Sequence, residues 1–152
     1  MLQMLELRTV GAPLAGPLGE FFERLRAAGD ERQFHPHPLD RAEADRRTRY
    51  DGRDLYYVLM DEGRVIGYGM LRGWDEGYDI PSLGIAVHPD ERGKGLSRLI
   101  MLFLHAAAKR RGAGTVRLTV NADNATALRL YREIGYTLRD MGGGRLEGII
   151  RL

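Results

Sequence analysis

The feature that most constrains the fold of this sequence is a glycine-rich turn between an apolar strand and an amphipathic helix. The run from Ser82 to Val87 is short and apolar, and His88-Pro89 ends it. After the turn, apolar residues recur three or four positions apart from Leu96 to Ala107, which is the spacing of one helix face. The pattern therefore predicts a strand, a tight turn and a helix in direct succession.

The same kind of reading extends over the rest of the chain. Apolar periodicity and turn residues predict strands at 3–9, 55–60, 64–71, 82–87, 115–120, 136–139 and 145–150, and helices at 14–25, 40–47, 96–107 and 124–134. Three strands able to pair antiparallel precede a strand-helix-strand-helix unit. We expect an α/β fold (an α+β mixed sheet) in the order β-α-α-β-β-β-α-β-α-β-β, as a single domain over residues 1–152.

Composition narrows the classes of function. The chain has 152 residues, of which 43% are hydrophobic, and its formal charge is only +2, which is not a strong nucleic-acid signal. It contains no cysteine, which excludes disulfides and thiolate nucleophiles and fits a reducing compartment. No apolar run approaches the roughly 20 residues of a membrane span, and residues 1–6 do not resemble a signal peptide. We expect a cytoplasmic monomer or homodimer that binds neither nucleic acid nor membrane.

The turn Arg92-Gly93-Lys94-Gly95 suits an anion. A helix N-terminus leaves backbone N–H groups unpaired and carries the positive end of the helix dipole. Glycines let the backbone approach a ligand closely, and Arg92 and Lys94 add positive charge. A merely glycine-rich surface turn is the alternative. Two other phosphate loops do not match, since His88 stands where a Walker loop needs glycine and Arg98 where a dinucleotide fingerprint does.

Two segments resemble the GNAT superfamily of N-acetyltransferases. The segment from Ile85 to Ser97 is similar to that family's acetyl-CoA pyrophosphate loop, whose pattern is [Gln/Arg]-x-x-Gly-x-[Gly/Ala]; Arg92 and Gly95 match, and Ser97 replaces the last small residue. The segment from Asn121 to Tyr136 is similar to the family's other acetyl-CoA segment, with Asn, then Ala, then Leu-Tyr and a closing Gly-Tyr. Together they cover about 81–136.

The resemblance implies an acetyl-CoA-dependent N-acyltransferase with a splayed central pair of parallel strands. It implies that pantetheine pairs with the free backbone groups of one strand, much as a peptide adds to a sheet edge. The implied cofactor-binding residues are Ile85, Ala86 and Val87 for pantetheine, Arg92, Gly93, Lys94, Gly95, Leu96 and Ser97 for the pyrophosphate, and Asn124 for the pantetheine arm.

The resemblance also places Tyr131 beside the thioester sulfur. There an acceptor amine attacks the thioester carbonyl and the CoA thiolate leaves, and a phenol can protonate that thiolate as general acid. The alternative is a core aromatic on an apolar helix face with Leu128 and Ile134. The general base is not assigned; Asp75, Glu76 and Asp79 are acidic residues ahead of the cofactor strand.

In the family that the chain resembles, the regions 33–39 and 73–81 form the acceptor side, and they supply His35, His37, Trp74 and Glu76 as candidate substrate contacts. The two histidines alone do not make a metal site, which usually needs three or four ligands, so we expect no metal. The stretch 67–78 is also similar to acyltransferases associated with surface-polysaccharide synthesis. We therefore expect a small-molecule amine acceptor, with a nucleotide-linked amino sugar ahead of a protein N-terminus or lysine; a non-catalytic acyl-CoA sensor is a further alternative.

Overall fold

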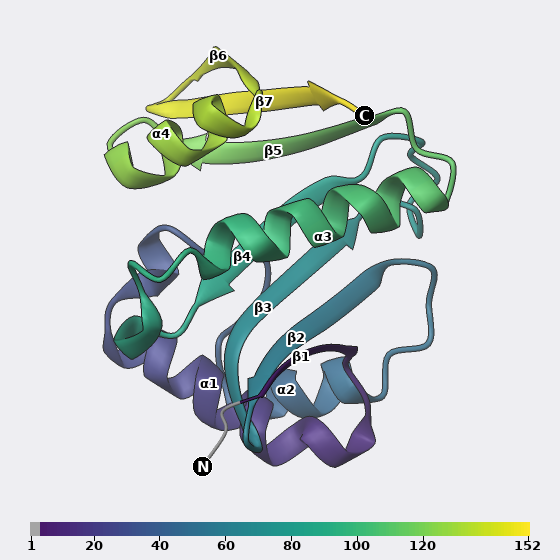
Figure 1. Ribbon diagram of the computed structural model, residues 1–152, viewed down its shortest axis with the longest axis vertical. Coiled ribbons are helices and arrows are strands. Elements are labelled where there is room, and N and C mark those ends of the chain that lie inside the picture. Colours follow the sequence, from purple (N-terminus) through teal and green to yellow (C-terminus); the bar gives the residue numbers. More distant parts are fainter. Residues whose placement is uncertain (1–3) are drawn as a thin grey trace.

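A seven-stranded sheet in the order β1-β2-β3-β4-β5-β7-β6 runs through the protein, with helices on both faces (Figure 1). The computed structural model describes residues 4–152, so the start predicted for the first strand at residue 3 lies outside the described residues. The strands are β1 Leu5–Thr9, β2 Leu55–Asp61, β3 Arg64–Arg72, β4 Ser82–Val87, β5 Thr115–Asn121, β6 Thr137–Gly142 and β7 Arg145–Arg151. The helices are α1 Ala15–Ala27, α2 Arg41–Thr48, α3 Leu96–Arg110 and α4 Ala125–Ile134.

The predicted mixed α/β architecture is confirmed. Every neighbouring pair of strands is antiparallel except β4 and β5, which are parallel. The last strand, β7, inserts between β5 and β6, pairing with both. Successive strand residues point to opposite faces, and both faces carry apolar side chains. Helices therefore cover both faces of the sheet.

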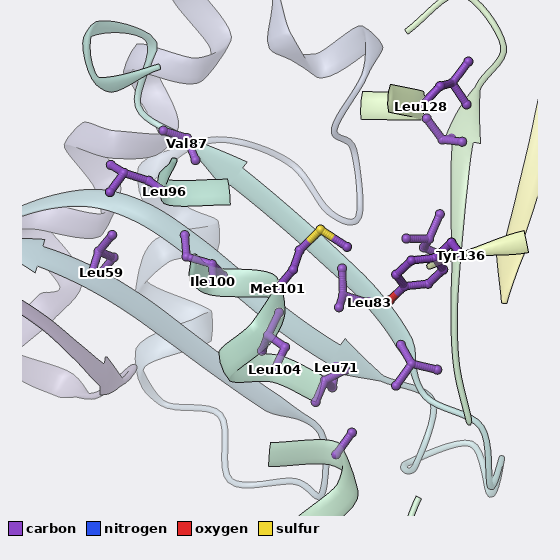
Figure 2. Close-up of a cluster of buried hydrophobic side chains, with 14 of the residues drawn as sticks. Leu59, Leu71, Leu83, Val87, Leu96, Ile100, Met101, Leu104, Leu128 and Tyr136 are labelled. Carbon is purple, nitrogen blue, oxygen red and sulfur yellow. The ribbon is translucent and has the colours of Figure 1, made fainter. Parts of the chain in front are cut away.

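Two apolar cores lie on the two faces of this sheet. On one face, Phe21 and Phe22 of α1 pack with Tyr68 of β3, and all three are at most 1% exposed. On the other face, side chains of α3, α4 and the neighbouring strands pack together; those labelled in Figure 2 are Leu59, Leu71, Leu83, Val87, Leu96, Ile100, Met101, Leu104, Leu128 and Tyr136. Burying one such side chain stabilises the fold by roughly 1.5–3 kcal/mol.

Side chains of helix α3 occupy the space above two glycines of β3. A Cβ atom added at Gly69 would lie 2.7 Å from Ile100 Cγ2, and one at Gly67 would lie 2.6 Å from Ile100 Cδ1. Both distances are shorter than a real Cβ atom keeps from a neighbouring heavy atom, so a larger residue at either position would force Ile100 to shift. The two glycines therefore leave room for the Ile100 and Leu104 side chains of α3 on β3.

The parallel pair β4 and β5 separates along its length (Figure 1). The two strands are in register at one position, Ser82 opposite Arg117, where the Arg117 N–H donates to the Pro81 carbonyl at 3.0 Å. Within residues 4–152, no ladder pairing joins the remainder of β4 to β5. The expected splay is therefore present, and it leaves the edge of β4 from Leu83 to Val87 open towards β5.

Candidate active site

The loop that leaves β4 is shaped by glycines in the left-handed region. The φ angles of Gly93 and Gly95 are +78° and +80°, which other residues adopt only at a cost of about 1–2 kcal/mol. Gly95 is the residue that caps α3, and no side chain hydrogen-bonds to this helix end. The first N–H groups of α3 therefore have no partner within the helix and lie beside the end of β4, where Figure 2 shows Leu96 close to Val87.

The two basic side chains of this loop are held by carboxylates of the protein. Lys94 Nζ lies 2.7 Å from Glu91 Oε2, and this contact, with help from Arg64, holds the pKa of Glu91 below its usual range. Arg92 pairs with Asp30, which lies in the segment between α1 and α2, and also donates to the Val87 carbonyl at 3.3 Å. The charged side chains of the loop are therefore already paired with carboxylates, and the backbone N–H groups are its donors without a carboxylate partner.

Asn124 and Tyr131 lie on α4. The Asn124 side chain accepts a hydrogen bond from the Ala127 N–H at 3.3 Å and so caps the start of the helix. Tyr131 is half-buried against the core of the α3 face, and burial raises the pKa of its hydroxyl to about 12. Its ring centroid lies 5.9 Å from that of Tyr136, whose own hydroxyl is hydrogen-bonded to His105 Nε2 at 2.6 Å.

A cavity of about 980 Å³ opens on the face of the sheet that α1 and α2 cover. Its floor is formed by residues of β4, β5 and β7, and its walls by the α1–α2 segment and the β3–β4 loop. In β5 and β7 the lining side chains alternate with those that face α3, whereas Leu83 of β4 belongs both to the lining and to the α3 core. Lining residues are Gln33, Phe34, His35, Pro36, Met70, Arg72, Gly73, Glu76, Tyr78, Asp79, Ile80, Ser82, Leu83, Gly84, Arg117, Thr119, Arg145 and Glu147.

Of the four predicted substrate contacts, His35 and Glu76 line this cavity, whereas His37 does not. His37 Nε2 lies 2.9 Å from the Tyr68 hydroxyl, and the histidine ring packs against Phe22 with centroids 5.1 Å apart. Burial lowers the pKa of His37, which favours the neutral ring. His37 therefore belongs to the aromatic core beneath α1, and its expected place on the acceptor side is corrected.

Trp74, the fourth of these candidate substrate contacts, does not line the cavity either. It is 6% exposed, belongs to the α3 core, and has the Arg111 guanidinium 4.5 Å above its ring. The cause is Asp54, whose Oδ1 accepts the backbone N–H groups of Gly73 and Trp74 at 3.0 and 2.9 Å. These bonds fold the loop back onto the start of β2, so the indole turns inwards and not into the cavity.

The polar residues on the cavity floor were not among the predicted site residues. Arg117 donates to Ser82 Oγ at 2.7 Å and pairs with Glu147 Oε2 at 3.1 Å, and Arg139 reaches the other oxygen of Glu147 at 2.7 Å. The bonds from Arg117 and Arg139 lower the pKa of Glu147. The available signal was the alternation of polar and apolar residues in 115–121 and 145–151, which places the polar set on one face.

The α1–α2 segment is tied across the cavity to the end of β5. Asn121 Nδ2 donates both to the Arg32 carbonyl and to Gln33 Oε1, each at 2.9 Å, and Arg32 pairs with Asp123. The segment therefore contacts both regions that resemble acetyl-CoA segments, through Arg92 at one end and Asp123 at the other.

No group of three or more His, Cys, Asp or Glu side chains is placed to hold a metal ion within residues 4–152. No helix in the same range combines the length and the apolar character that crossing a bilayer requires.

The split parallel pair, the glycine loop that opens α3 and the sheet order define one class of protein, and the sequence agrees with it. Residues 20–136 match the Acetyltransferase (GNAT) family. The chain belongs to that family.

Its relatives include several acetyltransferases. The chain is 32% identical over 125 residues to a mycothiol acetyltransferase of Rhodococcus opacus. The matched region covers 75% of this chain and 41% of the relative. The chain is 32% identical over 101 residues to the L-methionine sulfoximine/L-methionine sulfone acetyltransferase of Salmonella typhimurium, covering 62% of this chain and 59% of the relative. The chain thus spans about two fifths of the length of the mycothiol enzyme that it matches.

Solved structures share the fold at lower identity. The GNAT domain of S. lividans PAT superposes with a TM-score of 0.83 at 18% identity, covering 97% of this chain and 90% of that one. The PaiA N-acetyltransferase from Thermoplasma acidophilum, solved in complex with coenzyme A, superposes with a TM-score of 0.79 at 14% identity, covering 98% and 99%.

Proposed function

We propose that this protein transfers an acetyl group from acetyl-CoA to a primary amine of a small molecule. The observation that carries the proposal is the gap between β4 and β5, which has the N-terminus of α3 beside the end of β4 and a cavity of about 980 Å³ on the opposite face. Membership of the acetyltransferase family supports the acetyl transfer. The two sides of the gap then serve two different substrates.

The residues of the open edge and the glycine loop fit a coenzyme A molecule. In this proposal the unpaired edge of β4 at Ile85, Ala86 and Val87 hydrogen-bonds the pantetheine amides, and Asn124 lies along the pantetheine arm. The pyrophosphate lies on the N–H groups at the start of α3, where the dipole favours an anion. The loop residues involved are Arg92, Gly93, Lys94, Gly95, Leu96 and Ser97.

When bound, acetyl-CoA supplies a thioester whose carbonyl carbon an amine attacks and whose C–S bond then breaks. Tyr131, as the proposed general acid, directs its phenol O–H at the departing sulfur as a hydrogen-bond donor, and its pKa of about 12 keeps that proton available at neutral pH. The attacking ammonium must lose a proton, and Glu76 and Asp79, exposed at the cavity rim, are the candidates to accept it through water.

The acceptor in this proposal is a small molecule. Relatives are named for mycothiol, for methionine sulfoximine or methionine sulfone, and for streptothricin, none of which is a protein. A nucleotide-linked amino sugar is the finer form of the proposal, and the cavity volume and the lining aromatic residues Phe34 and Tyr78 support it. A protein N-terminus or lysine is the alternative acceptor.

Release of the coenzyme A thiol tests the proposal. Acetyl-CoA is incubated with the protein and with separate panels of amino-sugar nucleotides, free amino acids, polyamines and short peptides, and the free thiol is measured. Turnover on a small amine is the expected result. Turnover on peptides alone would overturn the choice of acceptor, and coenzyme A binding by calorimetry without turnover on any amine would favour a sensor.

A further inference from the structure

Of the three arginines that line the cavity, two form no ion pair with a carboxylate of residues 4–152. Arg117 is paired with Glu147 at 3.1 Å. For Arg72 and Arg145, the contacts within residues 4–152 are to neutral oxygens: Arg72 donates to the Pro36 carbonyl and Arg145 to Thr119 Oγ1, both at 2.7 Å. The floor of the cavity is therefore positive at two places.

Of these two arginines, Arg145 is the one with a buried N–H group that lacks an acceptor among the described residues. Its Nε is buried and has no hydrogen-bond partner among the described residues, although its Nη2 is held by Thr119. An unpaired buried N–H of a charged group costs free energy. Because Nε is closed to solvent, a ligand oxygen would approach the Nη end of the guanidinium, where the described contact is the one to Thr119 Oγ1. Held at one end by Thr119, the guanidinium is oriented before any ligand arrives, which suits the fork-like binding of a carboxylate or phosphate.

Arg72 extends the positive floor towards the start of β4. It is half-buried, lies in register with Ser82 and borders the same cavity. Carboxylates without an ion pair among the described residues, Glu76 and Asp79, line the cavity too, but they are exposed and lie on the β3–β4 loop. Apart from Glu147, which is paired with Arg117 on the sheet, the carboxylates that line the cavity lie on the loop, whereas the arginines lie on the strands.

A molecule that carries only an amine would leave the positive floor uncompensated. We propose that the acceptor carries an anionic group, a carboxylate or a phosphate, which binds Arg145 while its amine faces the gap between β4 and β5. The identity of that molecule as an acceptor rests on the proposed function. The anion site rests on Arg145 and the cavity alone, so the two ideas fail separately.

Pairs of amines that differ only in the anionic group provide the first measurement. L-leucine is compared with L-leucinamide, and glucosamine 6-phosphate with glucosamine, as acceptors in the thiol-release assay; a UDP-linked amino sugar forms a fifth arm. The carboxylate and phosphate arms separate the two sources of negative charge. We expect the anionic member of a pair to have the higher kcat/KM by about 10- to 100-fold, as charge-assisted hydrogen bonds provide.

Binding of the acetylated products provides a second measurement that needs no turnover. N-acetyl-L-leucine and N-acetylglucosamine 6-phosphate are titrated into the protein with coenzyme A present, beside their neutral counterparts N-acetyl-L-leucinamide and N-acetylglucosamine. Calorimetry gives the affinities. An anionic preference here without turnover on any amine would retain the anion site and reject the proposed function.

Variants assign the preference to one side chain. Arg145→Gln should abolish the anionic preference with little change for neutral ligands, and Arg145→Lys should restore part of it because the charge returns without the fork. Arg151→Gln is the matched control, since Arg151 lies on the same strand and face, is exposed, and does not border the cavity. Thermal melts check that each variant is folded.

The result that overturns the proposal is a wild-type protein that treats charged and neutral ligands alike in both measurements. An anionic preference that survives in Arg145→Gln, or is lost equally in Arg151→Gln, also overturns it, since the preference then arises elsewhere.

Discussion

Replacing Tyr131 by Phe removes one hydroxyl and leaves the ring in place, which isolates the proposed chemistry from packing. General acid catalysis is typically worth about 10²–10⁴-fold in rate. The pKa of Tyr131 is about 12, whereas a free thiol has a pKa of about 8.5, so complete transfer of the proton to the leaving thiolate is unfavourable by about 3.5 pKa units, or roughly 5 kcal/mol. We infer that the hydroxyl stabilises the departing sulfur mainly through a hydrogen bond.

That inference sets the size of the effect. A hydrogen bond to a charged group contributes about 1.5–3 kcal/mol, so kcat in Tyr131→Phe should fall by about 10- to 100-fold, near the lower limit for general acids. The dissociation constant of acetyl-CoA should stay nearly unchanged, because the interaction strengthens only as the sulfur gains charge. Since the phenol deprotonates only near pH 12, this group should cause no loss of kcat between pH 8 and 10.

Tyr136→Phe is the matched control for the same assay. Its hydroxyl is bonded to His105 Nε2 at 2.6 Å, so this variant should lose about 1–3 kcal/mol of stability and keep its kcat. Thiol-release kinetics with the best amine and thermal melts distinguish the two variants. Wild-type kcat in Tyr131→Phe, or an equal loss of kcat in both, would refute a role for Tyr131 in the reaction.

Three further changes test the loop, an ion pair and the packing of α3. Gly95→Glu places a carboxylate at the start of α3 and requires a non-glycine residue to adopt a positive φ angle. Calorimetry should therefore show strongly reduced affinity for coenzyme A. Equal affinity in the two proteins would rule out anion binding by this loop. The two arginines beside Glu147 lower its folded-state pKa, so their stabilisation is present above the unfolded pKa of about 4.3 and is lost as pH falls below it; melting temperatures from pH 6 to 3 should fall less steeply in Glu147→Gln. Gly69→Val forces a side chain against Ile100 and Leu104 and should cost about 1–3 kcal/mol in urea unfolding, with no change expected if α3 moves away freely.

The sequence predicted the elements well because each has a local cause. The helix predicted to start at Leu96 does start there, with Gly95 in the left-handed conformation as its cap. The second helix begins after Asp40, whose side chain accepts the Glu43 N–H at 2.7 Å. The splay of β4 from β5 came from the family resemblance, since periodicity alone does not report whether two strands separate. The single domain and the roles of the cofactor-binding residues stay predictions.

Trp74 and His37, the two candidate substrate contacts that do not line the cavity, are held by contacts with residues distant in the sequence. Trp74 lies in a segment rich in glycine and acidic residues, which indicates an exposed loop. Its burial depends on Asp54, 20 positions earlier, and on Arg111 at the end of α3. His37 is drawn inwards by the hydroxyl of Tyr68, 31 positions later. Local patterns contain no signal for either contact.

The ion pairing on the charged cavity floor could not be predicted from the sequence alone. Alternation in the last strand does place Arg145 and Glu147 on the same face, and alternation in β5 does the same for Arg117 and Thr119. Which of these four side chains meet depends on β7, and not β6, pairing with β5. Because that register puts Glu147 opposite Thr119, its carboxylate reaches Arg117, and Arg145 is left with a neutral hydroxyl. The arginine left for a ligand is therefore chosen by strand order, a property that no stretch of this sequence encodes by itself.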